Sequence, residues 1–213
     1  MAVELYLSGV WVDSRTQAPA SRVAAVCVAI AALLFSPDIV RAGASEDCSA
    51  AFDRHDYAEA LRLCRPLAEQ GEDIAQTTLG SMYEHGWGVS QNDAEAVKWY
   101  RKAAEQGEAM AQTHLGVMYD HGQGVTQDST QAVSWFRKAA EQGEAGAQTA
   151  LGVMYESGIG VPPDNVLAHM WLSLAAAQGN GDAAKLRDSL ARFMNPDQIA
   201  EAQRLAREWK PTK

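Results

Sequence analysis

Apolar residues follow a helical period in the segment 73–85. Four of them fall on one face of an α-helix because they are spaced by four, three and one residues, namely Ala75, Leu79, Met82 and Tyr83. Gly86 follows, and glycine adopts without steric cost the left-handed conformation that ends many helices. The pattern predicts a helix over residues 73–85 that ends at Gly86.

A second amphipathic segment follows a short Gly-x-Gly-Val loop. Asn92 stands where a helix N-cap is expected, and Glu95 lies three residues later, as in a capping box. A broad apolar face then recurs through residues 93–105, formed by Ala96, Val97, Trp99, Tyr100, Ala103 and Ala104. We expect a second helix over residues 93–105, antiparallel to the first because the connection is short.

This pair of segments occurs three times with a period of 36 residues. The phrase AQTTLGSMY at 75–83 returns as AQTHLGVMY at 111–119 and as AQTALGVMY at 147–155. A period of this length is typical of solenoids, in which each unit packs against its neighbours and whose usual role is binding. The sequence predicts an all-α solenoid of stacked helix pairs, with repeats at 72–107, 108–143 and 144–179.

Degraded copies of the unit extend the array at both ends. Residues 45–71 are expected to form a capping helix pair, with helices over 45–54 and 57–69 and a kink at Pro66. Residues 180–213 are expected to form two C-terminal capping helices, over 182–192 and 196–209. Asn195, Pro196 and Gln198 are a strong start signal for the second one.

Three glycines stand in register inside the first helix of each repeat: Gly80, Gly116 and Gly152. A glycine inside a helix costs about 1 kcal/mol relative to alanine. We therefore expect a close approach of a partner backbone or an aromatic ring at these positions. The candidate rings are Trp99, Trp135 and Trp171 or their neighbours.

The repeated pattern A-x-x-x-L-G-x-x-Y-x-x-G-x-G-V, followed by A-V-x-W-[YF]-x-K-A-A-x-x-G, resembles the Sel-one-like repeat, a relative of the tetratricopeptide repeat. It is complete at residues 75–107 and 111–143, whereas the copy at 147–179 has Leu172 in place of the aromatic residue. The resemblance implies a right-handed superhelix that works as a scaffold or adaptor for other proteins. It implies no catalytic residues.

The charge of the chain narrows the class of partner. The formal net charge is −9, and the three acidic and three basic residues of the segment 1–44 cancel, so the excess lies on the repeats. An acidic body argues against binding of nucleic acid or anionic lipid through general electrostatics. We expect a monomer that binds a protein or peptide partner.

The N-terminal segment predicts export. Residues 23–35 are an uninterrupted apolar stretch, preceded by Arg22 and followed by the small-residue segment VRAGA at 40–44. This stretch is typical of a secretory signal and short for a membrane span. We predict cleavage after Ala42 or Ala44, no membrane insertion of the mature chain, and a periplasmic or secreted location. Residues 1–21 are long for a signal, which a start downstream of Met1 explains; an uncleaved anchor is the alternative.

Cleavage would remove Cys27 and leave Cys48 and Cys64 as the cysteines of the mature chain. An even pair in an exported protein is a candidate disulfide. The two cysteines lie opposite each other if residues 45–54 and 57–69 form an antiparallel pair turning near His55. A disulfide that closes the N-terminal cap and a pair of buried free thiols are the two readings of this pattern.

No residue pattern indicates a catalytic, cofactor or metal site. His85 and His121 are equivalent in neighbouring repeats, but packed helices lie about 8–10 Å apart, whereas zinc ligands approach the ion to about 2.1 Å. The Gly-rich loops lack the Lys-Ser or Lys-Thr that a phosphate-binding loop needs. No Ser/His/Asp or Cys/His nucleophile signature is visible.

Positions where the repeats disagree are the candidates for partner binding. They lie on the first helix and the loop after it, and the predicted site is Thr78, Glu84, Trp87, His114, Asp120 and Gln123, with Ala150 and Ile159 as their counterparts in the third repeat. Trp87, an aromatic residue between two glycines, resembles a binding anchor. Packing of Trp87 against the adjacent loop is the alternative interpretation.

Two functions from different classes are compatible with this pattern. The first is an exported, non-catalytic scaffold that binds a protein through its superhelical groove. The second is a secreted β-lactamase-like or penicillin-binding enzyme, a class to which cysteine-rich repeat proteins have been linked. Those relatives carry a cysteine pair in nearly every repeat, and the complete repeats here carry none, which favours the scaffold.

Overall fold

The computed structural model describes residues 37–212, which form helices and no strands. Two compact units divide the chain, one of residues 1–43 and one of residues 44–213. The predicted signal stretch, residues 23–35, lies outside the described residues. No helix in the described part of the chain combines the length and the apolar composition needed to cross a bilayer.

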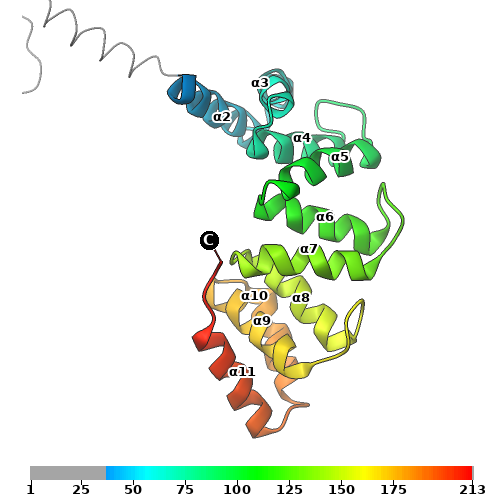
Figure 1. Cartoon of the computed structure of the whole chain (residues 1–213), viewed down its shortest axis with the longest axis vertical. Coiled ribbons are helices and arrows are strands. Elements are labelled where there is room, and N and C mark those ends of the chain that lie inside the picture. Colours follow the sequence, from blue (N-terminus) through cyan, green and yellow to red (C-terminus); the bar gives the residue numbers. More distant parts are fainter. Residues whose placement is uncertain (1–36, 213) are drawn as a thin grey trace, which may run out of the picture. The chain divides into compact units, whose positions relative to one another are not determined.

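Consecutive helices pack in pairs through the second unit (Figure 1). The repeats form α4 (Asp73–His85), α5 (Asp93–Glu105), α6 (Ala109–His121), α7 (Ser129–Glu141), α8 (Ala145–Ser157) and α9 (Asn165–Ala177). In the first repeat both helices have the predicted bounds. The all-α solenoid of stacked helix pairs is confirmed.

The end helices also form. They are α2 (Pro37–Asp53) and α3 (Tyr57–Glu69) at the N-terminal side, and α10 (Gly181–Ala191) and α11 (Pro196–Glu208) at the C-terminal side. Helix α2 begins at Pro37, earlier than the predicted residue 45, and proline suits a first helical position. Helix α3 continues through Pro66 to Glu69.

Helix ends follow the predicted capping chemistry. Gly86 has φ 72°, in the left-handed region, and Gly122 and Gly158 repeat this conformation. Asn92 accepts a hydrogen bond from the backbone N–H of Glu95, as an N-cap should. The reciprocal half of that capping box does not form, because the Asn92 backbone N–H donates to the Tyr83 carbonyl at 2.8 Å. Both halves form at Asn195 and Gln198.

In each repeat, the glycine inside the first helix is in close contact with a side chain of the second helix. A Cβ on Gly80 would lie 2.7 Å from Tyr100 Cδ1, and one on Gly116 would lie 2.8 Å from Phe136. At Gly152 the side chain is Leu172. The predicted close approach is confirmed, and the neighbours of the tryptophans make it.

The loop of each repeat contains a second glycine that contacts the backbone of the preceding unit. A Cβ on Gly88 would lie 2.8 Å from the carbonyl oxygen of Tyr57, at the start of α3. The same Cβ on Gly124 would overlap the backbone of Asp93, and on Gly160 that of Ser129. These glycines have φ of 66–71°, so a side chain is excluded by both conformation and space.

Buried glutamines join successive repeats. Gln76 Nε2 donates to the Ala68 carbonyl at 3.0 Å, and Gln76 Oε1 accepts from Gln106 Nε2 at 2.8 Å. The same two bonds recur at Gln112 and at Gln148, which is fully buried. Because each buried amide bonds the preceding unit and also the end of the second helix of its own repeat, it fixes how one repeat sits on the unit before it.

The C-terminal end closes differently from the repeats. Helix α11 packs against α9, and residues 209–212, which we call the strap, run back toward the end of α7 (Figure 1). Thr212 donates to the Glu141 carbonyl from its backbone N–H at 2.8 Å and from its hydroxyl at 3.1 Å. The Trp209 ring meets Trp171 edge-on at 6.2 Å.

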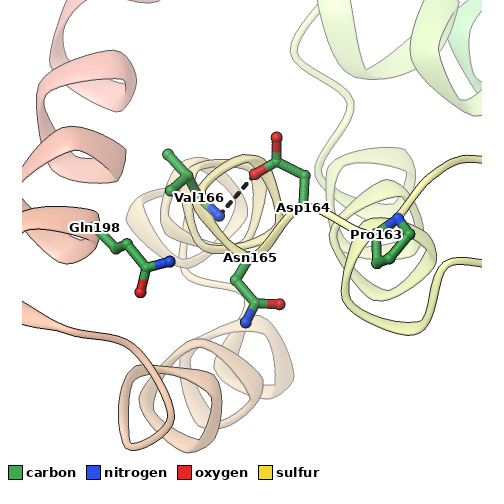
Figure 2. Close-up of a pocket in the computed structure, with 5 residues that line it drawn as sticks. All are labelled: Pro163, Asp164, Asn165, Val166 and Gln198. Carbon is green, nitrogen blue, oxygen red and sulfur yellow. Dashed lines mark hydrogen bonds between the residues drawn. The ribbon is translucent and has the colours of Figure 1, made fainter.

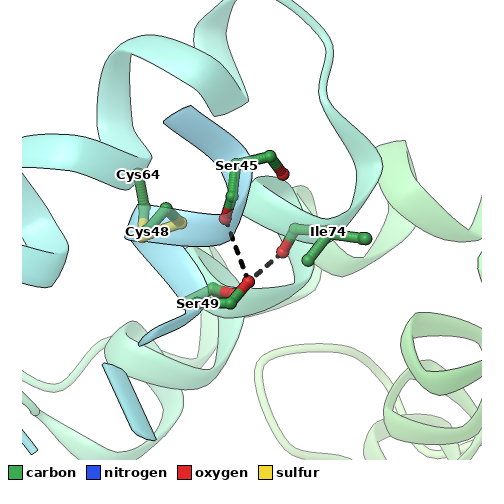
Figure 3. Close-up of a disulfide and its surroundings, with 6 residues drawn as sticks. Ser45, Cys48, Ser49, Cys64 and Ile74 are labelled. Carbon is green, nitrogen blue, oxygen red and sulfur yellow. Dashed lines mark hydrogen bonds between the residues drawn. A yellow bond between two sulfur atoms is a disulfide. The ribbon is translucent and has the colours of Figure 1, made fainter. Parts of the chain in front are cut away.

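At the N-terminal end, a disulfide joins α2 to α3. Cys48 and Cys64 are fully buried and bonded to each other (Figure 3). They precede Glu84 and Tyr100 by one period of 36 residues. The disulfide therefore stands where the first repeat has a hydrogen bond from the Tyr100 hydroxyl to Glu84.

Substitution of Gly124 should show how much the backbone contact between two repeats contributes to the free energy of unfolding. Gly124→Ala should lower the free energy of unfolding by about 2 kcal/mol more than Gly122→Ala, measured by urea denaturation. Gly122 has nearly the same φ, but its nearest neighbour is the Gln127 side chain rather than backbone. Equal losses in the two variants would show that the contact with Asp93 does not matter.

Removal of the disulfide should weaken the N-terminal cap. The double variant Cys48→Ala, Cys64→Ala should lose about 2–4 kcal/mol of stability relative to the oxidised protein. Non-reduced protein should also show no free thiol from these cysteines. An unchanged unfolding midpoint, or two titratable thiols in the mature chain, would refute the cross-link.

Candidate functional site

Two of the predicted binding residues meet at the boundary between the first two repeats. The His114 Nδ1 atom on α6 lies 3.5 Å from Glu84 Oε2 on α4. The Tyr100 hydroxyl on α5 donates to the same oxygen at 2.5 Å. The His114 ring stacks on the Tyr100 ring at 4.7 Å with an interplanar angle of 1°. We call Glu84, Tyr100 and His114 the inter-repeat cluster.

The cluster contains one buried residue and two that are partly exposed. Tyr100 is fully buried, whereas the His114 side chain is 33% exposed and that of Glu84 is 17% exposed. Burial would by itself raise the pKa of Glu84, but the hydrogen bonds from His114 and Tyr100 outweigh it and the net pKa is lowered. Burial, and next the bond to Glu84, raise the pKa of Tyr100. The cluster thus presents an ionised carboxylate beside an imidazole.

The cluster is unique among the described repeats. One period later the corresponding residues are Asp120, Phe136 and Ala150, which can form neither the hydroxyl bond nor the imidazole contact. Asp120 instead accepts a hydrogen bond from the Ser129 hydroxyl at 3.3 Å. The first two repeats therefore differ from the next pair in the polar chemistry of this boundary.

Thr78 is nearly buried and does not lie on an open surface. Its side chain is 9% exposed, and its hydroxyl donates to the Ile74 carbonyl at 2.9 Å. Gln123 and Ile159 are exposed in the loops after α6 and α8. They belong to two successive loops, outside the inter-repeat cluster.

Trp87 packs against the N-terminal cap. Its ring stacks on Tyr57 at 5.1 Å and on His85 at 4.2 Å, and Phe52 lies at 5.6 Å. These contacts agree with the interpretation that Trp87 is a packing residue rather than a fully exposed binding anchor. Trp87 remains half-buried, so one part of its surface is still accessible.

Tyr100 was missed as a site residue because its position in the pattern marked it as core. The signal that could have revealed it is the alternation Tyr100, Phe136, Leu172 at one position. Only the first of these carries a hydroxyl, which needs a partner when buried. The glutamines at 76, 112 and 148 were missed for a related reason, since a repeated polar residue in an apolar phrase signals a buried hydrogen bond.

Other parts of the described chain offer little chemistry. A small pocket lies where the start of α9 meets the start of α11, lined by Pro163, Asp164, Asn165, Val166 and Gln198 (Figure 2). Asp164 already caps the N–H of Val166 at 2.9 Å. His85 and His121 each contact a carbonyl of their own helix at 3.0 Å. The described residues contain no group of three or more His, Cys, Asp or Glu that could hold a metal.

The Sel1 repeat model matches residues 73–108, 109–144 and 145–180, half of the chain. The chain belongs to the Sel1 repeat family. Sel1 repeats generally mediate protein interactions and are not catalytic. Their matched bounds begin one residue after the repeats expected from the period.

Two solved structures are similar to this Sel1 repeat protein. One is a Sel1 repeat protein from Oxalobacter formigenes, with 32% identity, a TM-score of 0.66, and coverage of 73% of this chain and 63% of that one. The other is c5321, a protective antigen of uropathogenic Escherichia coli strains that displays an SLR fold, with 31% identity and a TM-score of 0.55. That match covers 71% of this chain and 40% of the antigen. None of the curated proteins compared with the chain matches it.

The hydroxyl of Tyr100 should control the ionisation of Glu84. Tyr100→Phe keeps the ring that Phe136 supplies one repeat later, but removes a donor to the carboxylate, so the pKa of Glu84 should rise. A carboxyl whose pKa is lowered by folding stabilises the fold at pH values above its ordinary pKa. This stabilisation is lost as pH falls through the folded-state pKa. Because the folded-state pKa is higher in the variant, its acid unfolding should begin at higher pH.

Carboxyl NMR titration of Glu84 and unfolding as a function of pH measure the two effects. The loss at neutral pH should be about 1.5–3 kcal/mol, typical of a hydrogen bond to a charged group. Tyr119→Phe, which removes a hydroxyl that accepts from Arg101, is the matched control and should leave Glu84 unchanged. A Glu84 pKa that is equal in wild type and Tyr100→Phe would contradict the hydrogen bond.

Proposed function

We propose that the protein is an exported, non-catalytic Sel1 repeat scaffold. It binds a protein or peptide through the face formed by the first helices of its repeats and the loops after them. The observation that carries this proposal is the inter-repeat cluster, a partly accessible carboxylate and imidazole at positions where the repeats differ.

The binding face combines polar recognition with an aromatic border. Glu84 and His114 supply an acceptor and a ring at the first boundary. Asp120 and Gln123 continue the face into the second repeat, and Trp87, half-buried against the N-terminal cap, lies in the loop after α4. Because the helices beneath are fixed by packing, these side chains need little ordering when a partner binds.

Export is supported by the cysteine chemistry. The Cys48–Cys64 disulfide is of the kind that persists in oxidising compartments. The second compact unit begins at Ala44, so cleavage after Ala42 or Ala44 would remove the first residues of α2 and keep the part of α2 that carries Cys48. The cysteine pair of the repeat body is confined to α2 and α3, unlike the pairs in nearly every repeat of the cysteine-rich class.

A His114→Ala variant tests the binding face without altering the fold. Alanine is the residue that the third repeat carries at this position, so the packing should tolerate it. The full chain and the variant, immobilised separately, should differ in the proteins that they retain from an envelope extract, and each retained partner should bind the variant at least about tenfold more weakly.

Lys98→Ala is the matched control, because Lys98 is exposed on α5 and pairs with Glu95 on the same helix. This control should retain the same partners as wild type. Equal affinities of wild type and His114→Ala for every retained partner would exclude the proposed face.

A further inference from the structure

The strap packs on groups that the repeats carry more than once. In the structure it docks on three groups from neighbouring units: the carbonyl of Glu141 at the end of α7, Gly143 in the turn after it, and the ring of Trp171 on α9. A Cβ on Gly143 would lie 3.7 Å from the Trp209 ring and 3.9 Å from Pro211.

All three groups recur at the repeat period. One period earlier they are Glu105, Gly107 and Trp135, and two periods earlier they are Glu69, Gly71 and Trp99. The chain thus presents the same carbonyl, the same side-chain-free turn and the same indole at two further places. The repeats keep these residues although only the third copy meets the strap.

The two further copies are uncovered within the described residues. No heavy atom lies within 4 Å of a Cβ placed on Gly71 or Gly107. Glu69 and Glu105 are exposed, whereas Glu141 under the strap is only partly so. Carbonyls in the last turn of a helix have no intrahelical partner, so they can accept a bond of the kind that Thr212 makes.

One residue distinguishes the uncovered copies from the filled one. Lys102 Nζ and Lys138 Nζ lie 4.0 Å over the rings of Trp99 and Trp135. At the equivalent position the third repeat has Leu174, and Trp171 there meets Trp209 instead of a lysine. The lysine must therefore be displaced, or share the indole, when an aromatic side chain enters.

We propose that the turns after α3 and α5 bind an extended segment of another protein with the pattern aromatic-x-Pro-Thr. The chain's own strap, Trp-Lys-Pro-Thr, shows how such a segment docks. Its aromatic ring meets the tryptophan, its proline lies over the glycine, and its threonine donates to the helix-end carbonyl. A second copy of the chain is a poorer occupant, because its strap is held by its own third site at high effective concentration.

The probe is a fluorescein-labelled synthetic peptide of residues 207–213, titrated against the full chain and followed by anisotropy. Saturable binding is expected although the chain's own strap fills the third site. The double variant Trp99→Ala, Trp135→Ala should weaken binding at least about tenfold, as should replacement of the peptide's tryptophan by alanine.

A gain-of-binding variant keeps the test independent of destabilisation. Lys138→Leu makes the second copy resemble the third and should tighten binding about threefold or more, since displacement of a cation from the indole is no longer needed. His114→Ala, on the other face, should bind the peptide as wild type does, so this proposal and the preceding one fail separately.

Three results would overturn the proposal. The first is no saturable binding by either the full chain or Lys138→Leu. The second is binding that appears only after deletion of residues 209–213, which would mean that the third copy alone is a site. The third is concentration-dependent dimerisation that Trp209→Ala abolishes, since this would assign the copies to a second chain.

Discussion

Contact between the backbones of successive repeats is the constraint on which the rest of the structure depends. Gly88, Gly124 and Gly160 bring one loop onto the first turn of the preceding second helix, and no side chain fits between them. The buried glutamines then fix the register of the stack, because each bonds both the preceding unit and the second half of its own repeat. With spacing and register set, residues one unit apart in sequence come to lie side by side.

The inter-repeat cluster is a product of that constraint. Glu84 and His114 belong to different repeats and meet only because α4 and α6 are held at this separation, with Tyr100 between them. The positions of Glu84 and Tyr100 carry a disulfide in the cap and an aspartate with a phenylalanine in the second repeat. The fold therefore tolerates different side-chain contacts at these positions, so the residues there can vary with the partner.

The helices were predictable because their pattern is local and repeated three times. Capping residues such as Gly86 and Asn92, and the need for a neighbour at Gly80, could also be read from the sequence. Tyr100 could not, because the pattern shows that a residue is buried but does not show which polar atom its hydroxyl meets. Trp87 was ambiguous for the same reason. The strap has no periodic signal, and its contact with Glu141 joins residues 71 positions apart.

Native-state hydrogen exchange of the full chain tests most directly whether the repeats are coupled through these contacts. If the loop glycines and buried glutamines bind the repeats into one cooperative stack, the slowest amides of α4, α6 and α8 should open with the same free energy. Distinct opening free energies for each repeat, graded from one end of the array, would contradict a cooperative stack and with it a preformed binding face.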